Sequence, residues 1–200
     1  MRTAAVRSGR IVRMATGFYS AMIVVGLVWG LLRGLDVGWF AFGGSPAPGK
    51  AIALGLFLGL LGVAASYVLE RSVPGVRLLG ERFGMVLAGV GVREAITLAA
   101  LSSVGEELLF RGCLQEEVGL LPATIVFALV HVGPSRDYLW WTASAFVFGL
   151  GLGFLYEVHG GLLGPIVMHF VINAINISLL GTKAATRNAE ALGTMRPTGG

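Results

Sequence analysis

Long stretches without charged residues constrain this chain more than any other feature of its sequence. Met14–Leu32, Ala51–Leu69, Tyr138–Tyr156 and Gly161–Leu180 contain no Asp, Glu, Lys or Arg. About 20 helical residues, at 1.5 Å per residue, match the ~30 Å hydrocarbon core of a bilayer. The four stretches therefore predict membrane-spanning helices.

The composition agrees with a multi-pass integral membrane protein. Charged residues make up 13% of the chain, against about 25% in ordinary soluble proteins, and the mean hydropathy is +0.79. The basic residues form no cluster with interleaved aromatic residues, so we expect membrane lipids and no nucleic acid as partners. Cys113 is the single cysteine, which excludes an intramolecular disulfide and a four-cysteine zinc site.

Two further spans are less obvious than the first four. One is expected from about residue 92 to 118, and a shorter one from about 119 to 132. Val76–Val90 is apolar but short, which predicts an interfacial helix. The predicted fold is an all-α polytopic bundle of about six spans in a single domain, residues 1–200. Residues 182–200 are small and polar and are predicted to form a disordered tail.

The positions of the basic residues predict the orientation of this bundle. With six spans, the segments on the side of the N-terminus hold twelve basic residues: Arg2, Arg7, Arg10, Arg13, Arg71, Arg77, Arg82, Arg93, Arg136, Lys183, Arg187 and Arg196. The opposite segments hold only Arg33 and Lys50. Cytoplasmic loops of membrane proteins are enriched in Lys and Arg. Both termini are therefore predicted to be cytoplasmic.

A few polar residues interrupt the apolar stretches. They are Glu106, Glu107 and Arg111 in GEELLFRG, His131 in FALVHVG, and His169 with Asn173 in MHFVIN. Ionisable groups in a membrane are costly and usually face a functional site inside the bundle. We therefore expect these residues to form one buried site.

Helical spacing separates the roles of the two glutamates. Glu107 and Arg111 are four residues apart on one helical face, so they can form an ion pair that supports the site. Glu106 is turned by about 100° from Glu107 and is the freer carboxylate. We predict that Glu106 acts as a general base.

The remaining polar residues complete the pattern of a peptide hydrolase. His131 can hold the same water as Glu106 or transfer its proton. His169 and Asn173 are four residues apart on one helical face, and both can donate hydrogen bonds to an oxyanion. A base, a histidine that positions water and two oxyanion donors suit the hydrolysis of an amide bond.

These residues resemble the motifs of the CPBP family of intramembrane proteases, also named the Abi or CAAX-protease family, which includes the type II CAAX prenyl endopeptidase. The family motifs are EExxxR, FxxxH and HxxxN. The chain has Glu106-Glu107-x-x-x-Arg111, then Phe127-x-x-x-His131, then His169-x-x-x-Asn173. Three complete motifs in this order are highly specific. The resemblance covers a core of about residues 92–180.

The resemblance implies an intramembrane endopeptidase. Glu106 and His131 would activate water, and His169 with Asn173 would form the oxyanion site. No cofactor is favoured, because HExxH is missing and Asn is an unusual zinc ligand. The alternative is a divalent metal such as zinc on Glu106, His131 and His169, with one position open for water.

The substrate and the setting are left open by these residues. The substrate is expected to be a membrane-associated or lipidated protein or peptide. If the host is bacterial, the protein is expected in the plasma (inner) membrane. A non-catalytic immunity or scaffold protein with a structural polar cluster is the second hypothesis, and it predicts that Glu106→Gln keeps function. Proton or ion transport along Glu106, His131 and His169 ranks third.

Overall fold

The computed structural model of the protein describes residues 2–34 and 47–194. These residues form helices and no β-strand. The elements are α1 (Arg2–Leu32), α3 (Pro48–Ser72), α4 (Pro74–Leu87), α5 (Val92–Glu107), the π-helix η1 (Leu108–Gln115), α6 (Glu116–Val118), α7 (Leu120–Leu129), the 3-10 turn η2 (Arg136–Tyr138), α8 (Leu139–His159) and α9 (Leu163–Thr194). The predicted all-α class is confirmed.

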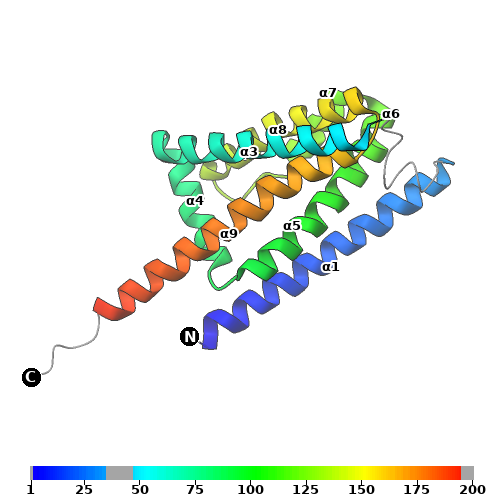
Figure 1. The fold of residues 1–200 in the computed structure, drawn as a ribbon. Coiled ribbons are helices and arrows are strands. Elements are labelled where there is room, and N and C mark those ends of the chain that lie inside the picture. The colour runs from blue at the N-terminus through cyan, green and yellow to red at the C-terminus, as the bar shows by residue number, and fades with distance from the viewer. Residues whose placement is uncertain (1, 35–46, 195–200) are drawn as a thin grey trace, which may run out of the picture.

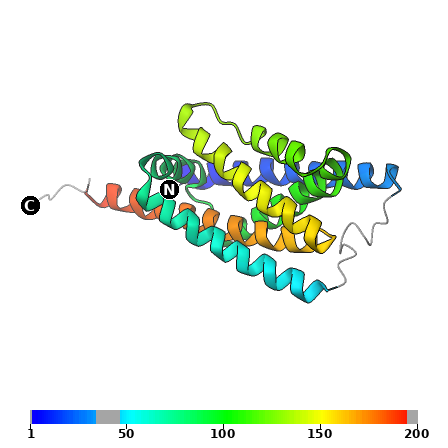
Figure 2. The same ribbon diagram turned by 90° about the horizontal axis from the view of Figure 1, so that it is seen from above.

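Helix α9 lies in the middle of the bundle. It packs against α3 on one side and α5 on another, while α1 lies beside α5 and α7 beside α8 (Figures 1 and 2). The beginning of α1 and the end of α9 lie toward the same end of the molecule (Figure 1). Which side of the membrane this end faces stays a prediction.

Close contact between α3 and α9 depends on glycine. A Cβ atom at Gly59 would lie 2.9 Å from the Cβ of Val171 and 3.0 Å from the carbonyl oxygen of Met168. Gly55 is equally close to α9, against Gly164 and Val167. Small residues allow two backbones to approach closely, which is how helices commonly associate in lipid.

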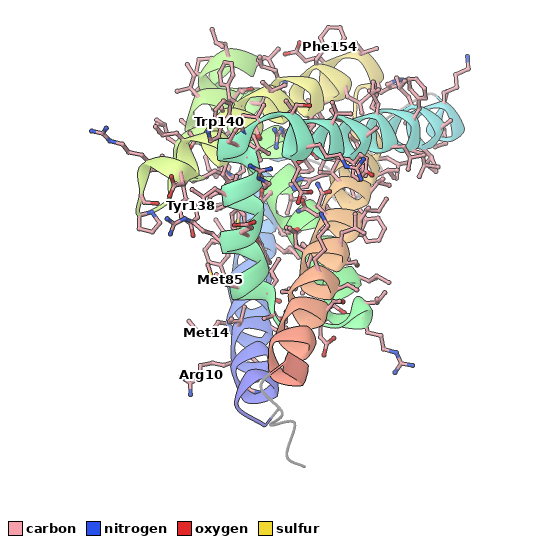
Figure 3. All side chains as sticks on the ribbon, turned by 90° about the vertical axis from the view of Figure 1, so that its left-hand side faces the viewer. Arg10, Met14, Met85, Tyr138, Trp140 and Phe154 are labelled. Atoms are coloured by element: carbon pink, nitrogen blue, oxygen red, sulfur yellow. The ribbon has the colours of Figure 1, made fainter. Side chains whose placement is uncertain are left out.

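The outer surface of the bundle is apolar. Met14, Met85 and Phe154 are 69%, 63% and 61% exposed, and their side chains point away from the bundle (Figure 3). Similar large apolar side chains are exposed on every long helix. Such a surface is suited to contact with lipid chains, because soluble proteins rarely expose large contiguous apolar areas.

Within residues 2–34 and 47–194, four helical segments are long and apolar enough to cross a membrane: Gly9–Leu32, Pro48–Ser72, Arg136–His159 and Leu163–Thr186. A fifth span is obtained if Pro74–Leu87 and Val92–Val118, which are bent by 109°, count together. The expected count of six is not confirmed. The main reason is that the segment expected to span the membrane at residues 119–132 contains only the 10-residue helix α7.

Helix α7 is too short to be the sixth span. It contains 10 residues, or about 15 Å, which is half of the hydrocarbon thickness. It begins after Gly119, whose φ of 85° reverses the chain, and it ends before the turn that contains Gly133 and Pro134. Turn-forming residues at both ends therefore limit its length.

The C-terminal segment differs from its prediction. Residues 182–194, expected to be disordered, continue α9 as helix; residues 195–200 lie outside the described residues. Alanines in this segment favour a helix, and the Thr182 hydroxyl donates to the carbonyl of Ser178. Lys183 also donates to both carboxylate oxygens of Glu70 at 2.8 and 2.9 Å, which joins α9 to α3.

Candidate active site

The glutamate pair lies where an α-helix changes to a π-helix. Helix α5 ends at Glu107 and η1 begins at Leu108. Both glutamates are buried, as are most residues of η1. π-helical turns are rare and occur frequently at functional sites.

Arg111 is tied to three neighbours. One guanidinium nitrogen donates to Glu107 Oε1 at 3.0 Å and another to the carbonyl of Gly149 on α8 at 3.1 Å. The guanidinium carbon lies 4.3 Å from the centre of the Phe127 ring. The predicted Glu107–Arg111 ion pair is therefore present, with side-chain exposures of 0% and 2%. Arg111 thereby connects η1 with α7 and α8.

Glu107 also holds His169. The Nδ1 atom of His169 lies 2.7 Å from Glu107 Oε1, and because a carboxylate accepts, this nitrogen carries the proton. Glu107 thus joins α5 to α9 as well as binding Arg111. In the neutral ring the Nε2 atom of His169 presents a lone pair.

His131 follows α7 rather than lying inside it. Its Nδ1 atom donates to the carbonyl of Phe127 at 2.6 Å, which satisfies a free carbonyl at the helix end. The Thr142 hydroxyl donates to the carbonyl of His131 at 2.9 Å. The ring packs between those of Phe127 and Trp141, with centroid distances of 4.5 and 5.0 Å. His131 is therefore held by both backbone and side-chain contacts.

The two histidines converge on Glu106. Glu106 Oε2 lies 3.7 Å from the Nε2 atom of His131 and 3.9 Å from that of His169. These distances exceed a direct hydrogen bond, and the buried Oε2 atom has no hydrogen-bond partner among the described residues. A carboxylate oxygen and two imidazole nitrogens from α5, the end of α7 and α9 thus surround one point. Three acceptor atoms suit a small molecule that carries protons, such as water.

Asn173 lies one turn beyond His169 on α9. Its Nδ2 atom donates to the hydroxyl of Ser102 at 2.9 Å. Ser102 is 2% exposed and precedes Glu106 by one turn on the same face of α5. An amide nitrogen has two protons, so Asn173 keeps a second one for another acceptor.

We expect Ser102→Ala to lower activity about fivefold by releasing the amide of Asn173, because a buried hydrogen bond contributes about 1 kcal/mol and 1.4 kcal/mol is tenfold in rate. Ser103→Ala is the matched control, since the neighbouring hydroxyl donates to the helix carbonyl of Ala100. Steady-state kinetics of both variants test this role. Equal activities in the two variants would contradict it.

All the predicted catalytic residues line one cavity. Its volume is about 660 Å³, and Glu106, His131, His169 and Asn173 contribute to its wall. The cavity extends along α9 from His169 to Lys183, a rise of about 21 Å. Most of its other lining residues are apolar. The supporting residues Glu107 and Arg111 lie behind this wall.

The metal alternative has a weaker geometric basis. In the described parts of the chain, no group of three or more His, Cys, Asp or Glu side chains has the arrangement of a metal site. This includes the set Glu106, His131 and His169.

Ser102 and Trp141 are residues of this cavity that the motifs do not include. Ser102 could have been found from its spacing, because it lies four residues before Glu106 on the same helical face. Trp141 packs on His131 and lines the cavity. No sequence signal distinguishes it from its neighbour Trp140.

Comparison with known proteins adds an independent observation. Residues 89–175 match the model of a family described as type II CAAX prenyl endopeptidase Rce1-like. This segment, less than half of the chain, is similar to that family. The match contains every motif residue from Glu106 to Asn173, and it confirms the resemblance predicted from them.

A curated relative also matches part of the chain. The chain is 39% identical over 87 residues to "Uncharacterized protein YpbD" of Bacillus subtilis (strain 168), which covers 42% of this chain and 44% of the relative. The match thus spans less than half of that relative's length. No solved structure gives a significant match. Together with the four candidate spans among the described residues, the match to the Rce1-like family indicates a multi-pass integral membrane protein.

Proposed function

We propose that the protein is an intramembrane endopeptidase that hydrolyses a peptide bond of a membrane-associated or lipidated protein or peptide. One observation carries this proposal: Glu106 Oε2 and the Nε2 atoms of two histidines converge at 3.7 and 3.9 Å on the wall of an apolar cavity. The description of the Rce1-like family supports the same reaction class.

In the proposed mechanism, a water molecule binds between Glu106 and His131. Its proton passes to Glu106 Oε2 while its oxygen attacks the carbonyl carbon of the substrate. The Nε2 atom of neutral His131 accepts the second hydrogen bond of the water, because its Nδ1 proton is held by Phe127. The attack gives a tetrahedral oxyanion.

The oxyanion requires hydrogen-bond donors. Asn173 offers the second proton of its amide, and His169 donates from Nε2 when its ring is a cation. Collapse of the tetrahedral species breaks the C–N bond, and Glu106 returns its proton to the leaving amine. Glu107 and Arg111 keep His169 in place through this cycle.

The length and the apolar lining of the cavity favour an apolar substrate. A length of about 21 Å along α9 matches about six residues of extended chain. Apolar walls favour a membrane segment or a lipid-modified peptide over a charged soluble one. In a bacterial host we propose that the protein lies in the plasma membrane. Its partners there would be membrane lipids and the membrane-associated or lipidated substrate.

Membrane peptidomics tests the function and finds the substrate. Membranes containing the protein are compared with membranes containing the Glu106→Gln variant at equal abundance. We expect precursor peptides to accumulate uncut in the variant. Identical peptide profiles would favour the non-catalytic scaffold hypothesis.

We further propose that hydrolysis needs no metal cofactor. The expected result is full activity after exhaustive dialysis against chelators, with the metal content of the same sample measured by mass spectrometry. Loss of activity that zinc restores would instead assign Glu106, His131 and His169 as ligands.

A further inference from the structure

Helix α1 borders Glu106, although it lies outside residues 89–175, the segment that matches the family model. A Cβ atom at Gly105 would lie 3.2 Å from the carbonyl oxygen of Tyr19 and 3.4 Å from the Cβ of Met22. One residue later in the chain is Glu106. The two helices lie side by side in both views (Figures 1 and 2). Glycine at position 105 thus allows the backbone of α1 to approach this part of α5.

Further contacts fix the position of α1 along α5 and η1. The thiol of Cys113 donates to the carbonyl of Gly26 at 3.4 Å. Leu108 packs over Gly26, where an added Cβ would overlap its side chain. Ile23 and Leu27 pack against the cluster that contains Leu108 and Cys113. The position of Tyr19 along α5 is therefore set by packing on both α5 and η1.

The side chain of Tyr19 faces the site. It lines the same cavity as Glu106, His131 and His169, and its hydroxyl is placed to donate to the Glu106 carboxylate. A hydrogen bond from Tyr19 to Oε1 would leave Oε2, which has no hydrogen-bond partner among the described residues, facing the two histidines.

The different surroundings of the two carboxylate oxygens matter because a glutamate rotates easily about its last side-chain torsion, χ3. The χ3 angle has broad, nearly twofold preferences, so an unrestrained carboxylate rotates easily. A hydrogen bond to a charged acceptor is stronger than one between neutral groups, so it favours one orientation of the carboxylate. Held at Oε1, the carboxylate keeps Oε2 directed at the point between His131 and His169.

We propose that Tyr19 is a positioning residue of the active site, supplied by α1, which holds Glu106 in the orientation required for water activation. The role rests on the proposed function, because it acts through the general base. It extends the site beyond the segment of residues 89–175 and beyond its three motifs.

Infrared spectroscopy of the full-length protein in lipid bilayers tests the contact without any substrate. Subtracting the spectrum of Glu106→Gln identifies the carboxylate bands of Glu106. We expect these bands to shift in Tyr19→Phe, because the hydroxyl that donates to the carboxylate is removed. Unshifted bands would overturn the proposal, whatever the activity of the protein.

Tyr156→Phe is the matched control for the infrared measurement and for the kinetic measurement that follows. It removes a similar hydrogen bond, from the Tyr156 hydroxyl to Glu116 at 2.7 Å, at a position outside the cavity. We expect it to leave the Glu106 bands and the turnover unchanged. Its thermal unfolding temperature shows what losing one tyrosine–glutamate hydrogen bond does to stability.

Kinetics then test the positioning role on a precursor peptide that accumulates in Glu106→Gln membranes. We expect Tyr19→Phe to lower kcat about tenfold or more with KM nearly unchanged, since the interaction aligns the base and does not bind substrate. An unchanged kcat, or a rise in KM alone, would overturn the proposal. Shifted infrared bands with no hydrolysis by the unmodified protein would instead overturn the protease function and leave the contact established.

Discussion

Replacing Glu106 by glutamine is expected to remove peptide hydrolysis while the protein stays folded. A general base contributes about 10²–10⁴-fold to the rate, and an amide cannot take the proton of the water. Glutamine has nearly the same shape and can still accept from Tyr19. We therefore expect kcat to fall by about 10²–10⁴, measured with purified protein and a precursor peptide.

The control for this experiment lies on the same helix. Glu94→Gln makes the identical chemical change at an exposed residue, whose carboxylate accepts from the backbone N–H of Gly91 at 2.8 Å. Glutamine can keep this cap at the start of α5. We expect full activity from Glu94→Gln. A Glu106→Gln protein that retains activity within a few-fold of the unmodified protein would exclude Glu106 as the base.

Replacing Arg111 by methionine is expected to cause the largest loss of stability. The change leaves the Glu107 carboxylate buried without its cation and the Gly149 carbonyl without a donor. Removing one partner of a buried ion pair typically costs about 3–5 kcal/mol. We expect a loss of this size in the free energy of unfolding, measured by equilibrium unfolding in mixed micelles.

Two further variants separate the charge from the packing. Arg93→Met removes an exposed guanidinium near the start of α5 and should change stability by less than about 0.5 kcal/mol. In the double variant Arg111→Met with Glu107→Leu, no uncompensated charge stays buried, so part of the stability should return. Activity should not return, because His169 has lost the acceptor of its Nδ1 proton. A double variant as unstable as Arg111→Met would show that packing, not charge, dominates.

The sequence predicted the all-α class and the long spans well because both depend on local composition. An uncharged run of about 20 residues has few alternatives to a membrane helix. The pairing of Glu107 with Arg111 was also predictable, since a spacing of four places two side chains on one face. The additional hydrogen bond from His169 to Glu107 was not, because 62 residues separate them in sequence.

Other features depend on contacts that a single sequence does not encode locally. The π-helix after Glu107 has no composition signal, and it is packed against α1, α7 and α8. Tyr19 looked like an ordinary residue of an apolar span, and only the approach of α1 to Gly105 brings it to Glu106. The roles of Glu106, His131, His169 and Asn173 stay predictions that the variants above test.

At the early end of α7, the candidate site is more exposed on the side of His131 than on the side of Glu107. The last carbonyls of α7 accept hydrogen bonds from the turn that follows, among them the Ala128 carbonyl from the His131 N–H and the Phe127 carbonyl from the His131 ring. His131 lies at this end and keeps 15% of its side chain exposed, whereas Glu107, across the site, keeps 0%. In the proposed mechanism, water would reach Glu106 past the end of α7, while the ion pair behind it stays buried. Hydrolysis in lipid would need both conditions at once, and the short helix α7 would provide them.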